Sequence, residues 1–96
     1  MTVERKMEQV AEAWRRQGFS CALWTDPPGR RWEDFVHGVD ERVMVLEGEM
    51  EFEVDGRVYH PLPGEELFIP AGAVHSARNI GRRTARWLYG YRRHGG

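Results

Sequence analysis

Residues 64–79 read GEELFIPAGAVHSARN, and this stretch decides the predicted fold. It predicts a short strand, a sharp corner at the PAG tripeptide and a second strand that begins near His75. Because a corner of this kind restrains the side chain that follows it, His75 is a candidate ligand residue. Upstream, His37 and Glu41 offer an imidazole and a carboxylate that the fold can bring to His75.

The bulk properties are those of one small domain over residues 1–96. Four Trp, four Phe and three Tyr enlarge a small core, and a homodimer would bury further surface. No apolar run is long enough to span a bilayer, and the first residues do not resemble a signal peptide. The single cysteine, Cys21, excludes an internal disulfide and is interpreted as a small buried residue. We therefore expect a cytoplasmic location.

Charge is balanced overall but unevenly distributed along the chain. The formal net charge of −1 gives no sign of nucleic-acid binding. In residues 33–66 acidic side chains greatly outnumber basic ones, whereas residues 76–96 hold six arginines and no acidic residue. One interpretation is a basic patch for an anionic ligand or RNA. We favour the other, in which acidic and basic strands face each other across a sheet or a dimer interface.

The N-terminal segment, residues 1–18, predicts an amphipathic helix. Apolar residues recur at helical spacing from Val3 to Trp14, with charged residues between them. Thr2 suits the N-cap, and Gly18 suits the C-terminal stop. We expect the Trp14 face to pack on the barrel or on a dimer mate rather than to recruit another partner.

The remainder of the chain predicts short antiparallel strands separated by turns. Strict alternation of acidic and apolar residues over 49–54 is typical of a half-buried strand, and Asp55-Gly56 is a hairpin signal. The predicted strands cover residues 19–24, 32–37, 42–46, 49–54, 57–60, 67–69, 74–79 and 85–92. This pattern predicts an all-β fold, a small barrel or double-sheet roll over 19–92, followed by a frayed tail over 93–96.

Residues from different predicted hairpins can form a metal site. If His37 points into the barrel, alternation places Glu33 and Phe35 on the same face. Glu41 lies across a short loop from His37, and His75 follows the Pro/Gly corner of another hairpin. Two imidazoles and one carboxylate make a facial triad with open positions, which suits iron(II) and similar divalent ions.

The spacing of these residues resembles the two sequence motifs of the cupin superfamily. The second motif is complete, with Gly64, Pro70, Gly72, His75 and Asn79. The first motif is matched by Gly29, His37, Glu41 and Gly48. The chain is thus similar to a small single-domain cupin over about residues 19–92. The resemblance implies a jelly-roll barrel, usually dimeric, with a metal in the barrel mouth and structural roles for the motif Gly, Pro and Asn residues.

The chain departs from the first motif at Phe35, where the family has a histidine that normally binds the metal. The resemblance therefore leaves three metal ligands, His37, Glu41 and His75, for iron, manganese, nickel or zinc. Loss of one imidazole weakens metal binding, and the aromatic ring makes the pocket more apolar. The alternative is a metal-free pocket in which both histidines are hydrogen-bonded.

Other residues are candidates for the surroundings of this site. Several large side chains either line a pocket or belong to the core: Trp32, Phe35, Met44, Met50, Phe52, Trp87 and Tyr89. Asp40 is either a support for the imidazoles or a solvated loop carboxylate, and His60 is expected on the surface. Glu33 is a substitute ligand in principle, but four strand residues separate it from His37 by roughly 13 Å.

Two classes of function are consistent with these residues. The first is a metal-dependent enzyme of dioxygenase or isomerase type that acts on a small molecule. The second is a non-catalytic cupin, with or without metal, that binds or senses a small molecule. A metal-free enzyme with His75 or Glu41 as acid or base is a third candidate. Fold resemblance does not choose among them, and neither a nucleic acid nor a membrane is an expected partner.

Overall fold

A computed structural model describes residues 2–93, and within them it contains one helix and eight strands. The helix, α1, spans Val3–Arg16. The strands are β1 (Ala22–Asp26), β2 (Arg31–Phe35), β3 (Glu41–Glu47), β4 (Met50–Val54), β5 (Arg57–Tyr59), β6 (Glu66–Ile69), β7 (His75–Asn79) and β8 (Ala85–Tyr91). Apart from Arg93, the predicted tail lies outside the described residues. No helix in the described part of the chain is long and apolar enough to cross a membrane.

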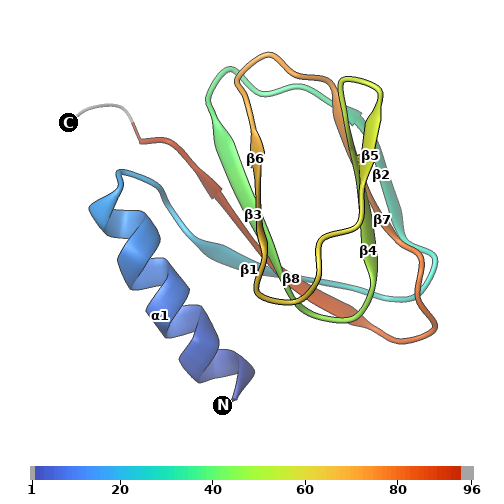
Figure 1. Ribbon diagram of the computed structural model, residues 1–96, viewed down its shortest axis with the longest axis horizontal. Coiled ribbons are helices and arrows are strands. Elements are labelled where there is room, and N and C mark those ends of the chain that lie inside the picture. Colours follow the sequence, from blue (N-terminus) through green and yellow to red (C-terminus); the bar gives the residue numbers. More distant parts are fainter. Residues whose placement is uncertain (1, 94–96) are drawn as a thin grey trace.

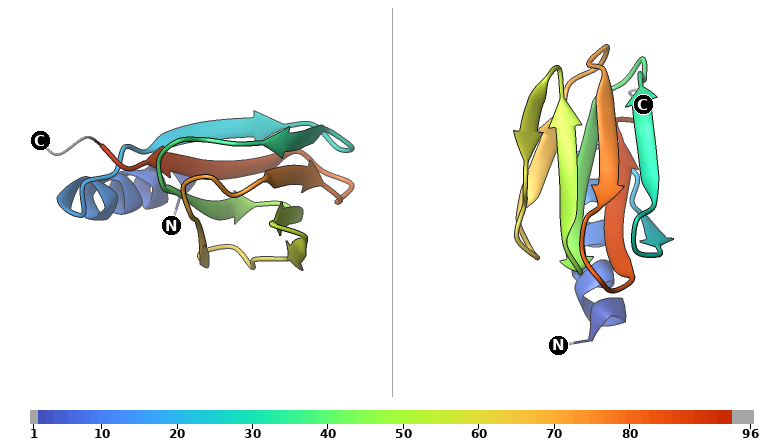
Figure 2. Two further views of the ribbon diagram at one scale, coloured as in Figure 1. Left: turned by 90° about the horizontal axis from the view of Figure 1, so that it is seen from above. Right: turned by 90° about the vertical axis from the view of Figure 1, so that its right-hand side faces the viewer.

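The strands form two four-stranded antiparallel sheets that face each other (Figure 1). One sheet has the order β1-β8-β3-β6, and the other has the order β2-β7-β4-β5, whose strands lie side by side in the right-hand view of Figure 2. Only β4 and β5 are consecutive strands of the same sheet, and they form the predicted hairpin. Every other connection crosses between the sheets, which confirms the predicted all-β jelly roll with an N-terminal helix.

The main core lies between the sheets and follows the alternation of each strand. On β4, Met50, Phe52 and Val54 are buried, whereas Glu51 and Glu53 are only partly buried. The rings of Phe52 and Trp87 meet edge to face, with centroids 5.4 Å apart. Burying an apolar side chain of this size stabilises the fold by about 1.5–3 kcal/mol. The predicted half-buried strand over 49–54 is therefore confirmed from Met50 onward.

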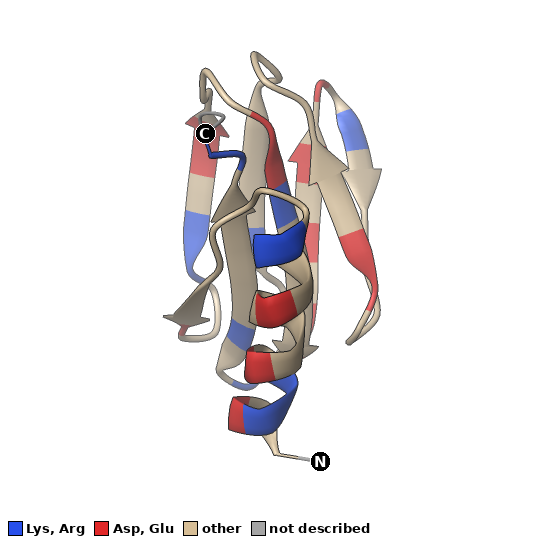
Figure 3. Ribbon diagram, turned by 90° about the vertical axis from the view of Figure 1, so that its left-hand side faces the viewer, with Lys and Arg blue, Asp and Glu red and all other residues tan. Residues whose placement is uncertain are grey.

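A second core lies between α1 and the outer face of the β1-β8-β3-β6 sheet. Thr2 caps the helix, because its side chain accepts the N–H of Arg5 at 3.1 Å. The side chains of this second core are Val10, Trp14, Phe19, Met44 and Leu88. The indole N–H of Trp14 also donates to Glu66 at 2.6 Å. The helix thus packs on its own barrel, and charged residues of both signs follow its length (Figure 3).

The structure explains why two of the motif positions, 48 and 72, require glycine. Gly48 has a φ of 91°, and a Cβ there would lie 2.8 Å from the Cα of Ala85. Gly72 has a φ of 84°, and its N–H donates to the carbonyl of His37 at 2.9 Å. A side chain at either position would meet strain or a clash. Gly72 therefore ties the corner before β7 to the loop that holds His37.

The uneven charge distribution has its counterpart on the outer face of the β2-β7-β4-β5 sheet. Arg78 on β7 lies between Glu33 on β2 and Glu51 and Glu53 on β4, with N···O distances of 2.8–2.9 Å. The hydrogen bond from Arg78 lowers the pKa of Glu33 to about 2, and the three carboxylates raise the pKa of Arg78. The predicted pairing of acidic and basic strands across a sheet is therefore seen for Arg78.

Two predicted strand bounds were wrong in ways that affect the site. The strand predicted over 32–37 ends at Phe35, so His37 lies on the following loop. The strand predicted over 19–24 begins at Ala22 and continues to Asp26, which the sequence placed in a turn. Pairing of β1 with β8 extends the strand, because Asp26 is the register partner of Ala85.

Candidate metal centre

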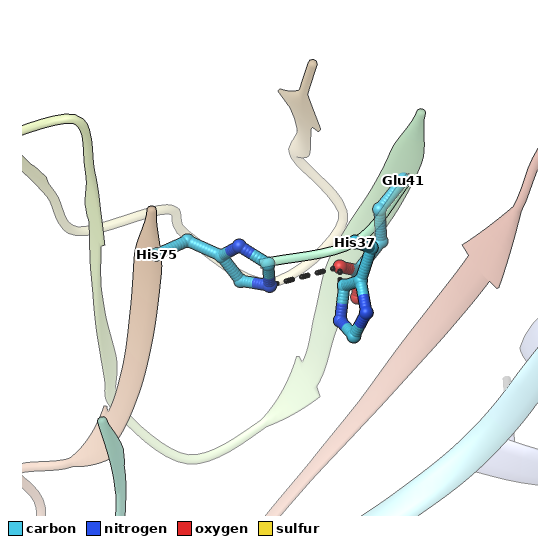
Figure 4. Close-up of side chains that lie close together, drawn as sticks. All are labelled: His37, Glu41 and His75. Atoms are coloured by element: carbon cyan, nitrogen blue, oxygen red, sulfur yellow. Dashed lines mark ion pairs between the residues drawn. The ribbon is translucent and has the colours of Figure 1, made fainter. Parts of the chain in front are cut away.

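Three side chains meet at one end of the barrel. His37, Glu41 and His75 each offer one ligand atom, and these atoms lie within 4.8 Å of one another. The Oε1 atom of Glu41 is 3.2 Å from Nε2 of His75 and 3.6 Å from Nε2 of His37 (Figure 4). Glu41 and His75 are buried, and His37 is half-buried. The structure therefore brings together the three residues that the sequence singled out.

The ring of His75 is oriented by its own corner. His75 is the first residue of β7, and its Nδ1 lies 3.1 Å from the carbonyl oxygen of Ala73. Since a carbonyl only accepts, Nδ1 carries a proton, and in the neutral ring Nε2 then turns a lone pair towards Glu41. Burial lowers the pKa of His75, but the Glu41 carboxylate and the Ala73 carbonyl outweigh it, so the net pKa is raised. A proton therefore competes with a metal for Nε2 at acidic pH.

Glu41 carries the strongest sign of an absent positive partner. It begins β3, is 4% exposed, and its Oε1 accepts no hydrogen bond from the described residues. A buried carboxylate oxygen without a donor is costly, unless a cation partners it. The two imidazole nitrogens converge on the same atom. A divalent ion with nitrogen and oxygen ligands fits this donor set.

The loop that carries His37 is held by several contacts. The His37 ring lies edge-on to Tyr91, with centroids 4.9 Å apart, and its Nε2 is 3.4 Å from the Tyr91 hydroxyl. Asp40 accepts the N–H of Ala71 and the Nε–H of Arg92, both at 2.9 Å. The hydrogen bond from Ala71 is the larger and that from Arg92 the smaller cause of a lowered pKa for Asp40. Asp40 thus ties the loop to its neighbours and does not orient either imidazole.

The predicted facing of β2 was wrong for Glu33. Glu33 lies on the outer face with Arg78, and Trp32 lines the barrel interior instead. The register against β7 shifts between Trp32 and Phe35, and Asp34 has a φ of 58°, so the strand contains a bulge. A bulge adds one residue and reverses the alternation, which excludes Glu33 as a substitute ligand while Phe35 still faces inward.

A cavity of about 200 Å³ opens beside the three ligand residues. Phe35, Phe52 and Trp87 line it, but Met44 and Met50 do not, which corrects the predicted pocket. Met44 faces the helix in the outer core, and Met50 belongs to the core between the sheets. Trp32 and Tyr89, which the sequence also indicated, are part of the cavity wall.

Several residues at this cavity were not predicted from the sequence, including the smaller lining residues Val43, Ile69 and Ala77. Trp24 and Tyr91 line it, and Asp26 lies behind its wall, fully buried, where it accepts indole N–H groups. Alternation was the available signal for Tyr91, which lies on the strand predicted over 85–92. Asp26 was missed because β1 runs two residues further than the predicted end at residue 24. Asn79, the last residue of the second motif, supports Asp26 by donating to its carbonyl at 3.1 Å.

Two other candidates lie away from the centre. His60 is exposed and contacts Glu51 at 3.0 Å, as expected for a surface residue. Cys21 is half-buried beside the helix, and burial raises the pKa of its thiol to about 11. A thiol that stays protonated at neutral pH is a poor nucleophile and a poor metal ligand.

The sequence and the fold of this chain match those of known proteins. The Cupin_2 family model, described as a cupin domain, matches residues 22–91. The crystal structure of TT1209 from Thermus thermophilus is 31% identical, with a TM-score of 0.70 over 78% of this chain and 73% of that one. The Cupin_2 domain of an XRE family transcriptional regulator from Enterobacter cloacae is 25% identical, with a TM-score of 0.71 over 81% and 84%.

One curated relative is much longer than this chain. A protein from Streptomyces cyaneus named polyketide synthase CurC is 33% identical over 63 residues, which are 65% of this chain and 41% of that protein. The chain therefore spans about two-fifths of the length of this relative. The family match covers both motifs and nearly the whole barrel, so this chain belongs to the cupin domain family.

Proposed function

We propose that this chain is a metal-dependent cupin that binds a small molecule in the barrel cavity, with His37, Glu41 and His75 as the metal ligands. The observation that carries the proposal is the buried Oε1 of Glu41, which lacks a hydrogen-bond donor among the described residues and has two imidazole nitrogens at 3.2 and 3.6 Å. Iron, manganese, nickel and zinc are the candidate ions, because all accept this mixed donor set.

The residues around the ligands prepare the cavity for a reaction of dioxygenase or isomerase type. A divalent ion held here supplies Lewis acidity and open coordination positions. Phe35 contributes no ligand atom, so a small molecule in the cavity can supply one in its place, with the Phe35 ring as part of the lining. Tyr91 is protonated at neutral pH, since even an unperturbed phenol is, and burial raises its pKa further to about 12. Its hydroxyl can donate to an oxygen of the bound molecule.

Metal content of the purified protein tests the proposal. We expect near-stoichiometric metal by elemental analysis after reconstitution, and loss of most of it in His75→Ala, because only two ligands remain. His60→Ala is the matched control, since His60 is exposed and outside the cavity, and it should retain the metal. A reconstituted wild-type protein that holds no metal would contradict the proposal.

A second candidate function, a ligand-binding or sensor cupin that needs no metal, is favoured by Phe35. This ring replaces one of the usual metal ligands, and a chain of similar fold is a cupin domain within a transcriptional regulator. This candidate predicts that a small molecule binds equally well before and after metal removal by a chelator. A large loss of binding on metal removal would exclude it in favour of the first.

A further inference from the structure

The wall of the cavity opposite the metal ligands is built from indoles whose polar groups are already used. Three indole N–H groups donate to the carboxylate of Asp26, from Trp24 at 2.9 Å, Trp32 at 3.0 Å and Trp87 at 2.9 Å. Asp26 is 1% exposed, and all three indoles line the cavity. Because the carboxylate accepts all three N–H hydrogen bonds, these side chains present ring carbons and no free N–H donor to a ligand.

These rings are also held in place by one another. The Trp24 and Trp32 rings meet edge to face at 5.6 Å, and Tyr89 packs edge-on against Trp24 at 6.2 Å. The guanidinium of Arg30 lies 4.3 Å from the centre of the Trp32 ring. A wall fixed by hydrogen bonds and ring contacts is preorganised, so little side-chain entropy is lost when a ligand binds.

The charges of the cavity differ between its two ends. Glu41 is the one acidic residue in the lining, and among the described residues no lysine or arginine lines it. The negative charge of Asp26 lies behind the indole wall. An anionic group at this end would be repelled and would find no cation, whereas a ligand oxygen at the other end would meet the metal ligands. The ligand therefore needs an uncharged apolar end and one polar end.

The size of the cavity limits the apolar end. Its volume is about 200 Å³. A protein cavity of about 150 Å³ accommodates benzene, so this one suits a single ring with small substituents. A sugar of the same size would place hydroxyl groups against ring faces that offer no partners, which costs free energy for each unpaired group.

We propose that this cavity selects molecules with one uncharged aromatic ring and an oxygen substituent directed at His37, Glu41 and His75, and that Asp26 is the positioning residue for the ring-binding wall. The proposal deepens the proposed function, on which only the role of the oxygen depends. The ring-binding end is complete with or without a metal, because none of its contacts involves the metal ligands.

Phenol is a suitable probe, and the four indole N–H resonances in ¹H–¹⁵N spectra are the readout. We expect phenol to shift the resonances of Trp24, Trp32 and Trp87 in a saturable way and to leave that of Trp14, which lies outside the cavity, unchanged. Cyclohexanol has the same size and oxygen without the aromatic ring, and it should bind about tenfold more weakly. Equal affinity for phenol and cyclohexanol, stronger binding of glucose, or no saturable shift would overturn the proposal.

Variants test the role of Asp26. Asp26→Asn replaces one acceptor oxygen by an N–H₂ group, which leaves one indole N–H without a partner, and phenol affinity should fall about tenfold or more. If this buried substitution prevents folding, Trp32→Leu removes one half-buried ring of the wall and should have the same effect. Trp14→Phe is the control and should bind phenol as the wild type does. Wild-type affinity in a folded Asp26→Asn or Trp32→Leu variant would refute the role of the wall.

The same titration in metal-loaded and chelator-treated protein separates this proposal from the metal centre. Phenol binding in a protein that takes up no metal supports the aromatic site, although the metal proposal then fails. Metal uptake without phenol binding refutes the aromatic site alone.

Discussion

Phe35 is the residue that most changes the expected chemistry of this cupin. Its ring centroid is 6.3 Å from that of His37 and 6.2 Å from that of His75, so it occupies the space beside both candidate ligands. The ring is 39% exposed, and its strand is held by backbone pairing with β7. Phe35 therefore offers no ligand atom and adds apolar surface beside the two candidate imidazoles.

Restoring an imidazole at this position should strengthen metal binding. We expect Phe35→His to raise metal affinity by at least about tenfold, because loss of even an indirect supporting contact commonly changes affinity by that much. Competition with a chromogenic chelator measures the change. Phe68→His is the control, since Phe68 is exposed and outside the cavity lining. Equal affinities in wild type and Phe35→His would show that position 35 is not directed at the metal.

At the scale of elements, β7 serves both faces of its sheet. His75 and Ala77 face the cavity, whereas Arg78 lies on the outer face between the glutamates of β2 and β4. The strand that presents the candidate ligand His75 is thus held laterally by ion pairs as well as by its backbone ladder. Surface ion pairs are individually weak, but several carboxylates around one guanidinium form a network.

Removing Arg78 should make the stability of the fold depend less on pH in the acidic range. Glu33 has a pKa of about 2 when folded, against an ordinary value of 4.5. Its contribution is therefore complete above about pH 4.5 and is lost as pH falls towards about 2. We expect Arg78→Met to lower Tm by a few degrees near neutral pH, with a difference that shrinks below about pH 4.5. Arg57→Met on β5 is the control, because Arg57 makes no ion pair with the described residues. A difference that does not vary with pH would contradict this account.

The helix is an integral part of the fold, because its Trp14 fills the outer core. Trp14 is 0% exposed and donates to Glu66 on β6. We expect Trp14→Ala to lower the free energy of unfolding in urea by about 3–5 kcal/mol. Metal content should remain unchanged, since Trp14 does not contact the cavity. Glu8→Ala on the exposed side of α1 should change stability little, and a similarly small effect of Trp14→Ala would show that the helix packs weakly.

At the scale of the whole molecule, a chain of 96 residues divides its apolar side chains between two cores and still leaves others in contact with solvent. Large hydrophobic side chains that are more than a third exposed are Trp24, Phe35, Val36, Val58, Leu62, Phe68, Val74 and Ile80. Trp24 and Phe35 belong to the cavity. The others are available to an interface.

A homodimer would cover part of this surface. We expect a dimer in solution, because a domain of this size buries only about three-fifths of its unfolded surface and gains stability from association. Light scattering at micromolar concentration measures the mass. A mass of one chain, near 11.2 kDa, would contradict the prediction.

The sequence alone determined the barrel and singled out the three candidate ligand residues. His37, Glu41 and His75 were recognised from motif spacing, although His75 and the other two come from different predicted hairpins. Strand alternation and the Gly/Pro corners are local features that act through backbone conformation within a few residues. The corner before His75 is a clear case, because Gly72 adopts a positive φ and places the histidine at the start of β7.

Tertiary structure decided which side chains face the cavity. Because of the bulge at Asp34, Trp32 faces the cavity and Glu33 faces outward. Pairing with β8 extends β1 to Asp26. The Asp26 cluster joins indoles from β1, β2 and β8, and Trp87 is 61 residues away from Asp26 in the chain. Alternation in the sequence predicts which side chains of a strand face inward only as far as the pairing register continues without a bulge. Register shifts, and contacts between strands of different sheets, depend on packing between distant segments, which no local pattern contains.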